Sequence, residues 1–138
     1  MTPIAQILGG TAAGVRPRTM GNGHAPASVK LMNRLGLCQT DFDVLELNEA
    51  FASQGLATLR QLGTAYDDAR INPNGGAIAP GHPLGMSGAR ITGTAALQLA
   101  LTDGTRSLSA FCIGVGQGIS IALERVGRLR SGRTRRLE

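Results

Sequence analysis

Apolar and polar residues are grouped along the chain so that strand patterns and helix patterns follow one another. The apolar run at residues 4–9, IAQILG, predicts a buried strand, and residues 44–47, VLEL, predict a second one. Between them we expect a helix over residues 26–35, because its apolar residues recur at helical spacing and a glycine follows the last of them. The segment before this helix contains several glycines and prolines and is expected to be a long loop.

The second half of the chain continues this alternation. Another helix is expected from about Glu49 to Gly63, with an apolar stripe made of Phe51, Gly55, Leu59 and Leu62. Residues 70–80, RINPNGGAIAP, predict an irregular third strand. A third helix should follow the turn GHPLGMSG, with Ser87 as its N-cap. Its small packing residues are Ala89, Gly93, Ala96, Leu97 and Ala100.

Two β-rich runs near the end, SLSAFCIG and GISIALERV, are joined by VGQ and predict a strand pair closed by a glycine turn. The resulting order is βαβαβαββ. It predicts an α/β domain with a mixed, mostly parallel five-stranded sheet, helices on its faces and an antiparallel last strand. Since no internal repeat or linker interrupts this order, we expect one domain over residues 1–126.

The net charge of +5 originates at the C-terminal end of the chain. Residues 1–124 hold eight basic and eight acidic side chains, whereas the sequence from Arg125 onward contains six arginines. Aromatic residues make up only 3% of the chain, and no basic face is indicated elsewhere. We therefore interpret residues 127–138 as a basic, disordered tail and expect neither nucleic acid nor a membrane as a partner.

The two cysteines do not form a recognisable redox or metal pattern. Cys38 and Cys112 lack a CxxC spacing, so neither a disulfide framework nor a zinc site is predicted. The first residues contain no basic segment ahead of an apolar stretch, and nowhere do about 18 apolar residues run together. These features fit a reducing, cytoplasmic compartment.

Polar residues lie where the predicted strands end. Asn48 and Glu49 follow the second strand. His82 lies in the turn after the third strand, and Cys112 ends the fourth, followed by Gly114. In α/β sheets, ligands bind beyond the carboxyl ends of the strands. An imidazole can accept a proton there, a thiol can shuttle one, and a backbone amide beside glycine can face an oxyanion, although each residue taken alone is more commonly structural.

Three segments resemble the signature motifs of the thiolase C-terminal domain. They are LNEAFA at 47–52, NGGAIAPGHPLGMSGAR at 74–90 and CIGVGQG at 112–118. They occur in the order and approximate spacing of that family, and the loop RPRTMGNGHAPA also looks like a thiolase segment. The resemblance extends from about Ile4 to Val126 and lies in irregular, glycine-rich segments, where chance matches are rare. It implies the C-terminal half of a coenzyme A-dependent acyltransferase with a thiolase-like fold.

The resemblance also implies a role for each polar residue. His82 would be the base that activates a nucleophilic cysteine, and Cys112 would exchange a proton with the second substrate. Asn48 would hold a water that forms one oxyanion site with His82, and the amide of Gly114 would belong to another. Glu49 would support the motif structurally.

The family's reaction is ping-pong: a cysteine takes an acyl group from one thioester and passes it to coenzyme A or to an acetyl-CoA carbanion. The segment FDVLELNEAFASQGLA is nearly identical to degradative thiolases of the 3-oxoadipyl-CoA type. This implies cleavage of 3-oxoadipyl-CoA to succinyl-CoA and acetyl-CoA. Coenzyme A and acyl-CoA are expected as substrates without a tightly bound cofactor, and an N-terminal thiolase half and further copies of the chain are expected as partners.

Two features depart from the family's pattern. The nucleophilic cysteine belongs to a separate N-terminal domain, which nothing in this sequence resembles. Cys38 is no substitute, because it lies where the family has no catalytic residue, and we interpret it as a partly buried structural thiol. His24 and Pro80 stand where related sequences commonly have proline and leucine, and either could alter a pocket wall.

Functions of other classes have weaker support in the sequence. GMSGA at 85–89 approximates the nucleophile elbow of serine hydrolases, but both histidines precede Ser87 and the second glycine is Ala89. GVGQG resembles a dinucleotide-binding turn, but a strand follows it instead of a helix. The stronger alternative is a non-catalytic domain that binds a partner or itself, since a domain without its partner half would expose an apolar face that favours dimerisation or aggregation.

Overall fold

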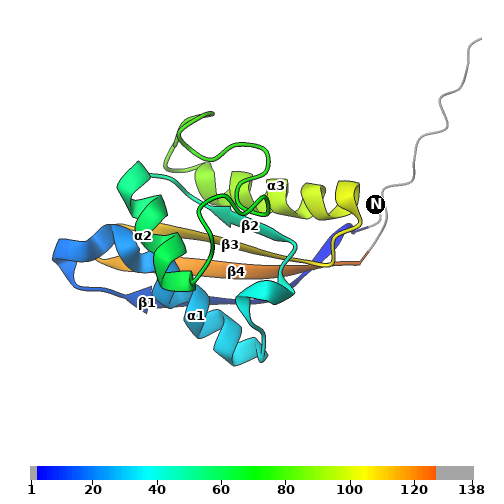
Figure 1. Ribbon diagram of the computed structural model, residues 1–138, viewed down its shortest axis with the longest axis horizontal. Coiled ribbons are helices and arrows are strands. Elements are labelled where there is room, and N and C mark those ends of the chain that lie inside the picture. Colours follow the sequence, from blue (N-terminus) through cyan, green and yellow to red (C-terminus); the bar gives the residue numbers. More distant parts are fainter. Residues whose placement is uncertain (1–2, 127–138) are drawn as a thin grey trace, which may run out of the picture.

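The computed structural model describes residues 3–126 as an open sheet flanked by helices (Figure 1). The sheet consists of the strands β1 (Ala5–Gly14), β2 (Val44–Leu47), β3 (Arg106–Ile113) and β4 (Gln117–Arg125). The helices are α1 (His24–Leu35), α2 (Ala52–Leu62) and α3 (Ser87–Thr102), with the short 3-10 segments η1 (Pro17–Gly23) and η2 (Gln39–Asp41). The predicted tail, residues 127–138, lies outside the described residues.

The strands are arranged in the order β1-β4-β3-β2. β2 and β3 run parallel, whereas β4 pairs antiparallel with β3 on one side and with β1 on the other. The expected α/β architecture with a mixed sheet and an antiparallel last strand is confirmed, because β1, β2 and β3 run in one direction and β4 runs against them. The first strand lies beside β4, and residues 11–14, which we expected in a loop, extend it by pairing with residues 117–120.

The predicted third strand is not found among the described residues, because residues 70–80 form a series of turns, and the described sheet has four strands instead of five. The prolines of this segment have no amide to donate to a sheet. Ile71 alone makes an isolated bridge, parallel to Leu45. The side chain of Asn72 hydrogen-bonds both backbone groups of Leu47, at 2.8 and 2.9 Å, so the segment is a loop tied to the end of β2.

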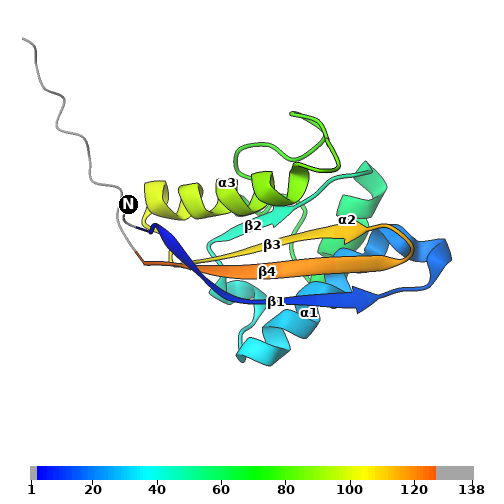
Figure 2. The same ribbon diagram turned by 180° about the vertical axis from the view of Figure 1, so that it is seen from behind.

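The helices cover the two faces of the sheet unequally (Figures 1 and 2). α1 and α2 lie on one face, where Leu31, Phe42, Leu45 and Leu108 form a buried cluster under α1 and Leu47, Leu59 and Ala110 form another under α2. α3 lies on the opposite face, where Ala95 and Leu99 pack against Val44. Seen from behind in Figure 2, β1 and β4 have no covering helix on that face.

Large apolar side chains remain exposed on the α3 side. Leu97 and Leu101 of α3 are 46% and 65% exposed, and Ile119 of β4 is 37% exposed. We predicted Leu97 as a packing residue, but the buried face of α3 lies at Ser87, Ile91, Ala95, Leu99 and Ala100. α3, with 16 residues, is the longest described helix, and none in the described part is long and apolar enough to cross a membrane.

Three helix starts differ from the sequence prediction. α1 begins at His24 instead of residue 26. α2 begins at Ala52 instead of near Glu49, because Phe51 is still extended, with φ −145°, and its side chain is 67% exposed instead of buried in the stripe. Ser87 is the first residue of α3, not its N-cap, and it makes no capping bond because its hydroxyl is used elsewhere.

Candidate active site

The end of β2 brings two of the predicted site residues into contact. Asn48 follows the last residue of β2 and is 1% exposed. Its backbone amide donates to the carbonyl oxygen of Ala110 in β3, at 3.0 Å, so the pairing of the two strands fixes its position. Its side-chain Nδ2 lies 3.3 Å from Nε2 of His82, which comes from the long loop between α2 and α3.

Ser87 determines which nitrogen of His82 carries the proton. The Nδ1 atom of His82 lies 2.6 Å from Oγ of Ser87, and that hydroxyl donates to the carbonyl oxygen of Pro83, at 3.1 Å. A hydroxyl has a single proton, so Ser87 accepts from an Nδ1–H group. Nε2 then keeps its lone pair and accepts from Asn48. This tautomer satisfies all three contacts and leaves Nε2 as the basic atom.

Cys112 and Gly114 lie at the same edge of the sheet, on the neighbouring strand. Cys112 is two residues beyond Ala110 on β3, and its half-buried thiol makes no hydrogen bond within residues 3–126. Gly114 is exposed and has no atom within 4 Å of the place a Cβ would occupy, so a ligand could approach its backbone. The structure places these groups near one edge without joining the thiol to the imidazole.

The predicted β3–β4 strand pair is confirmed, although its turn spans Gly114 to Gly116 instead of VGQ. Val115 and Gly116 have φ angles of 55° and 77°, a left-handed conformation that suits a tight hairpin. The carbonyl oxygen of Gly116 accepts from the amide of Val15 at 2.7 Å. The end of β1 therefore holds the turn next to Cys112 in place.

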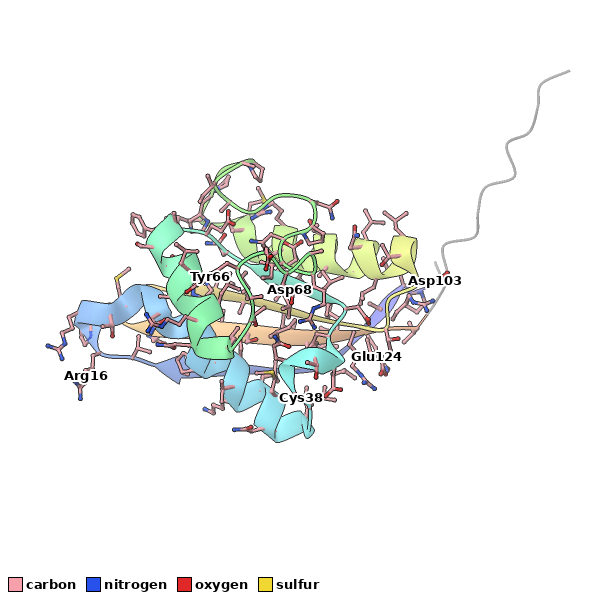
Figure 3. All side chains as sticks on the ribbon, in the orientation of Figure 1. Arg16, Cys38, Tyr66, Asp68, Asp103 and Glu124 are labelled. Carbon is pink, nitrogen blue, oxygen red and sulfur yellow. The ribbon has the colours of Figure 1, made fainter. Side chains whose placement is uncertain are left out.

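Glu49 is bound to the long loop and takes no part in the Asn48–His82 contact. Its carboxylate accepts from Nδ2 of Asn72 and from the amide of Ile78, each at 3.2 Å. It also packs so closely on Gly76 that a Cβ there would overlap it. These contacts favour a supporting role. A groove of about 520 Å³ lies beside Glu49, between α2 and the loop, near Tyr66 and Asp68 (Figure 3).

His24 is buried against the backbone of Asn48 instead of forming part of a pocket wall. It is 1% exposed, its Nε2 atom is 3.0 Å from the carbonyl oxygen of Asn48, and its Nδ1 atom is 3.1 Å from that of Gly21. Burial lowers the pKa of the imidazole, and the two carbonyl groups partly oppose this effect. Pro80, the other departure, is exposed in the loop.

Glu46 is a buried carboxyl group two residues before Asn48. It is 0% exposed, and neither of its oxygens has a hydrogen-bond partner among the described residues. Burial raises its pKa to about 7; Arg90 of α3 lowers it in part, and Glu49 raises it further. We did not predict this residue from the sequence, although a glutamate inside the apolar run VLEL is a visible sign of a buried carboxyl group.

One interpretation made from the sequence, that of Cys38, does not agree with the geometry, and one rejection, that of the nucleophile elbow, gains support. Cys38 is exposed, not partly buried: its thiol contacts Thr40 and Asp41 at 3.1 and 3.0 Å and closes the η2 turn (Figure 3). That turn precedes β2, so it lies at the opposite end of the strand from Asn48. Ser87 is fully buried, which argues against a nucleophile elbow, where the serine must be exposed.

The described residues contain no group of three or more side chains that could hold a metal ion. What they contain is an imidazole, a thiol, a side-chain amide and an open backbone at one sheet edge. The contact between Ser87 and His82 was not predicted from the sequence. A serine that follows a histidine by five residues, across a Pro-containing turn that starts a helix, is the signal that indicates it.

Several known proteins are similar to this chain in sequence. The family described as "Thiolase, C-terminal domain" matches residues 1–125. The beta-ketoadipyl-CoA thiolase of Pseudomonas putida is 60% identical over 126 residues, which are 91% of this chain and 32% of that protein. The 3-oxoadipyl-CoA/3-oxo-5,6-dehydrosuberyl-CoA thiolase of Escherichia coli K12 is 54% identical and covers 91% of this chain and 31% of that protein.

Two solved structures share the fold. Human mitochondrial 3-ketoacyl-CoA thiolase in complex with CoA superposes with a TM-score of 0.87 at 43% identity, over 91% of this chain and 31% of that one. The acetyl-CoA acetyltransferase of Bacillus anthracis gives a TM-score of 0.86 at 37% identity, over 91% and 32%. The chain thus spans about a third of the length of the relatives that it matches. It belongs to the thiolase family and corresponds to that family's C-terminal domain.

Proposed function

We propose that this chain provides the C-terminal part of the active site of a thiolase that uses coenzyme A to cleave 3-oxoadipyl-CoA into succinyl-CoA and acetyl-CoA. The observation that carries the proposal is the hydrogen-bonded series Asn48–His82–Ser87, which leaves Nε2 of His82 as a base. The names of relatives at 54–60% identity support the choice of substrate.

In this reaction the nucleophilic cysteine comes from the part of a thiolase that this chain does not cover. Nε2 of His82 takes the thiol proton, and the thiolate attacks the 3-oxo carbon. The C2–C3 bond breaks, the succinyl group stays on the cysteine, and the acetyl-CoA carbanion takes a proton from Cys112. Coenzyme A then gives its thiol proton to Cys112 and attacks the acyl group, and the released cysteine recovers its proton from His82.

Two groups would stabilise the negative charge that develops on oxygen. Oδ1 of Asn48 is buried and has no partner among residues 3–126, so it is a suitable acceptor for a water that forms an oxyanion site with His82. The open backbone amide of Gly114 would form a second site together with the amide of the absent nucleophile. A reducing compartment such as the cytoplasm would keep Cys112 as a thiol.

A second candidate is a domain that only binds a partner, favoured by the exposed Leu97, Leu101 and Ile119. We propose that the N-terminal part of a thiolase covers this apolar surface, which then assembles the active site. The same surface would promote association between copies of the isolated chain, and a strictly monomeric species at high concentration by light scattering would contradict this.

Activity tests the proposal directly. Thiolysis of 3-oxoadipyl-CoA is measured with the chain alone and with a chimera, in which the part of the Pseudomonas putida thiolase that precedes the matched region is fused to this chain. We expect turnover by the chimera and none by the chain alone. Turnover by the chain alone would mean that a different nucleophile acts, and an inactive but folded chimera would favour the binding function.

A further inference from the structure

Both histidines of the chain make hydrogen bonds to the same residue. Asn48 contacts His82 through its side chain, as described above, and it contacts His24 through its backbone carbonyl oxygen, 3.0 Å from Nε2. The two rings come from different elements, since His82 lies on the long loop and His24 is the first residue of α1. Asn48 therefore connects the proposed base to the start of α1.

His24 contacts the carbonyl oxygen of Asn48 at the point where the hydrogen-bond ladder between β2 and β3 ends. The amide of Asn48 still donates to Ala110 of β3. In a continued parallel ladder, the amide of Cys112 would be the next donor to the carbonyl oxygen of Asn48. The donor to that oxygen is instead the ring of His24. His24 thus ends the ladder directly beside Cys112.

Two carbonyl oxygens, those of Asn48 and Gly21, compete for the single proton of the neutral His24 ring. Nδ1 lies 3.4 Å from the side-chain amide nitrogen of Gln54, and that nitrogen also donates to the carbonyl oxygen of Gly21. The Gly21 oxygen, 3.1 Å from Nδ1, already accepts from Gln54, whereas the Asn48 oxygen has no other donor among the described residues. We therefore place the ring proton on Nε2, where it is donated to Asn48, and Nδ1 accepts from Gln54. Burial of the ring favours the same neutral form.

The backbone at His24 has little room to shift. A Cβ on the preceding Gly23 would lie 2.6 Å from backbone atoms of Gln117 and Gly118 at the start of β4, so the chain there packs directly on the sheet. The backbone of His24 is therefore held in place, and its ring contacts the Asn48 carbonyl oxygen from a fixed position.

We propose that His24 is a positioning residue for the thiolase reaction: it fixes the Asn48 peptide so that the Asn48 side chain meets Nε2 of His82. This inference rests on the proposed function for its effect on catalysis, but the contact itself can be measured in the chain alone.

Two substitutions separate the hydrogen bond from the packing. His24→Gln places an amide nitrogen near the position of Nε2, and His24→Met has similar length without a donor. Ser28→Ala is the matched control, because Ser28 is buried in the same helix and its hydroxyl contacts Ser120 instead of Asn48. The chain has two histidines, so in both His24 variants His82 alone contributes to the histidine ring spectrum.

The tautomer of His82 is read by long-range ¹H–¹⁵N NMR on the labelled chain. We expect the ring of His82 to give the same pattern, with its Nε2 unprotonated, in the wild type, in His24→Gln and in Ser28→Ala. In His24→Met we expect a mixture of the two His82 tautomers. In the chimera, His24→Met should lower kcat about tenfold with little change in KM, and His24→Gln should restore most of it.

An unchanged His82 pattern in His24→Met would overturn the proposal, and so would an equal disturbance in Ser28→Ala. If the chimera is inactive although the NMR patterns change as expected, the proposed function fails while the positioning contact stands.

Discussion

Replacing Glu46 by glutamine should change how the stability of the chain depends on pH. The carboxyl group is fully buried and has no hydrogen-bond partner among the described residues, so its charged form is strongly disfavoured. Its pKa rises from the ordinary 4.5 to about 7. Since a tenfold change in proton affinity corresponds to about 1.4 kcal/mol, ionisation of Glu46 costs the folded state about 3 kcal/mol.

The sign of the effect follows from which state holds the proton. Between pH 4.5 and about 7 the folded chain keeps a proton on Glu46 that the unfolded chain has lost. The free energy of unfolding therefore falls as pH rises through this window. Glu46→Gln cannot ionise, so its stability relative to the wild type should increase by about 3 kcal/mol from below pH 4.5 to above 7.

Urea unfolding followed by circular dichroism at several pH values, at constant salt, measures this difference. Taking the variant minus the wild type cancels the contributions of other titrating groups, including His24. Asp67→Asn, which removes an exposed carboxylate, serves as the control for a simple change in net charge. A difference that stays constant across the window would refute the argument, because it would mean that Glu46 ionises in the folded state as easily as in the unfolded one.

Three further predictions concern other positions. Ser87→Ala removes the acceptor for Nδ1 of His82 and should lower kcat of the chimera about 10- to 100-fold with little change in KM, measured by steady-state thiolysis. Gly23→Ala should cost more than about 2 kcal/mol in urea unfolding, because its Cβ would meet the backbone of β4, whereas Gly14→Ala, with open space at that position, should cost less than about 0.5 kcal/mol. The lowered pKa of His24 means that the unfolded chain binds a proton there below pH 6.5 that the folded chain refuses, so stability should be lost as pH falls below 6.5, less steeply in His24→Gln.

The order of helices and most strands could be predicted because each depends on its own local pattern. The glycines that follow Leu35 and Leu62 end α1 and α2 in the left-handed conformation, as the sequence indicated. The sequence also indicated that Asn48 and Cys112 lie near the same sheet edge. Asn48 follows β2 and Cys112 lies near the end of β3, and these two strands are parallel neighbours.

What could not be predicted depends on contacts between distant segments. Residues 70–80 have apolar residues like a strand, but their backbone pairs with β2 only around Ile71, and side chains of Asn72 and Glu49 hold the segment beyond that bridge. The pairing of β1 with β4 joins the two ends of the chain, which no local pattern encodes. The contacts of His24 with Asn48 and of Ser87 with His82 likewise arise from packing.

The most direct test of the account compares thiolysis of 3-oxoadipyl-CoA by the wild-type chimera with that by His82→Ala and Cys112→Ala chimeras. The account predicts that kcat falls at least about 100-fold in each variant, because each loses a proton-transfer group. Wild-type turnover in either variant would contradict the assignment of this sheet edge as the active site.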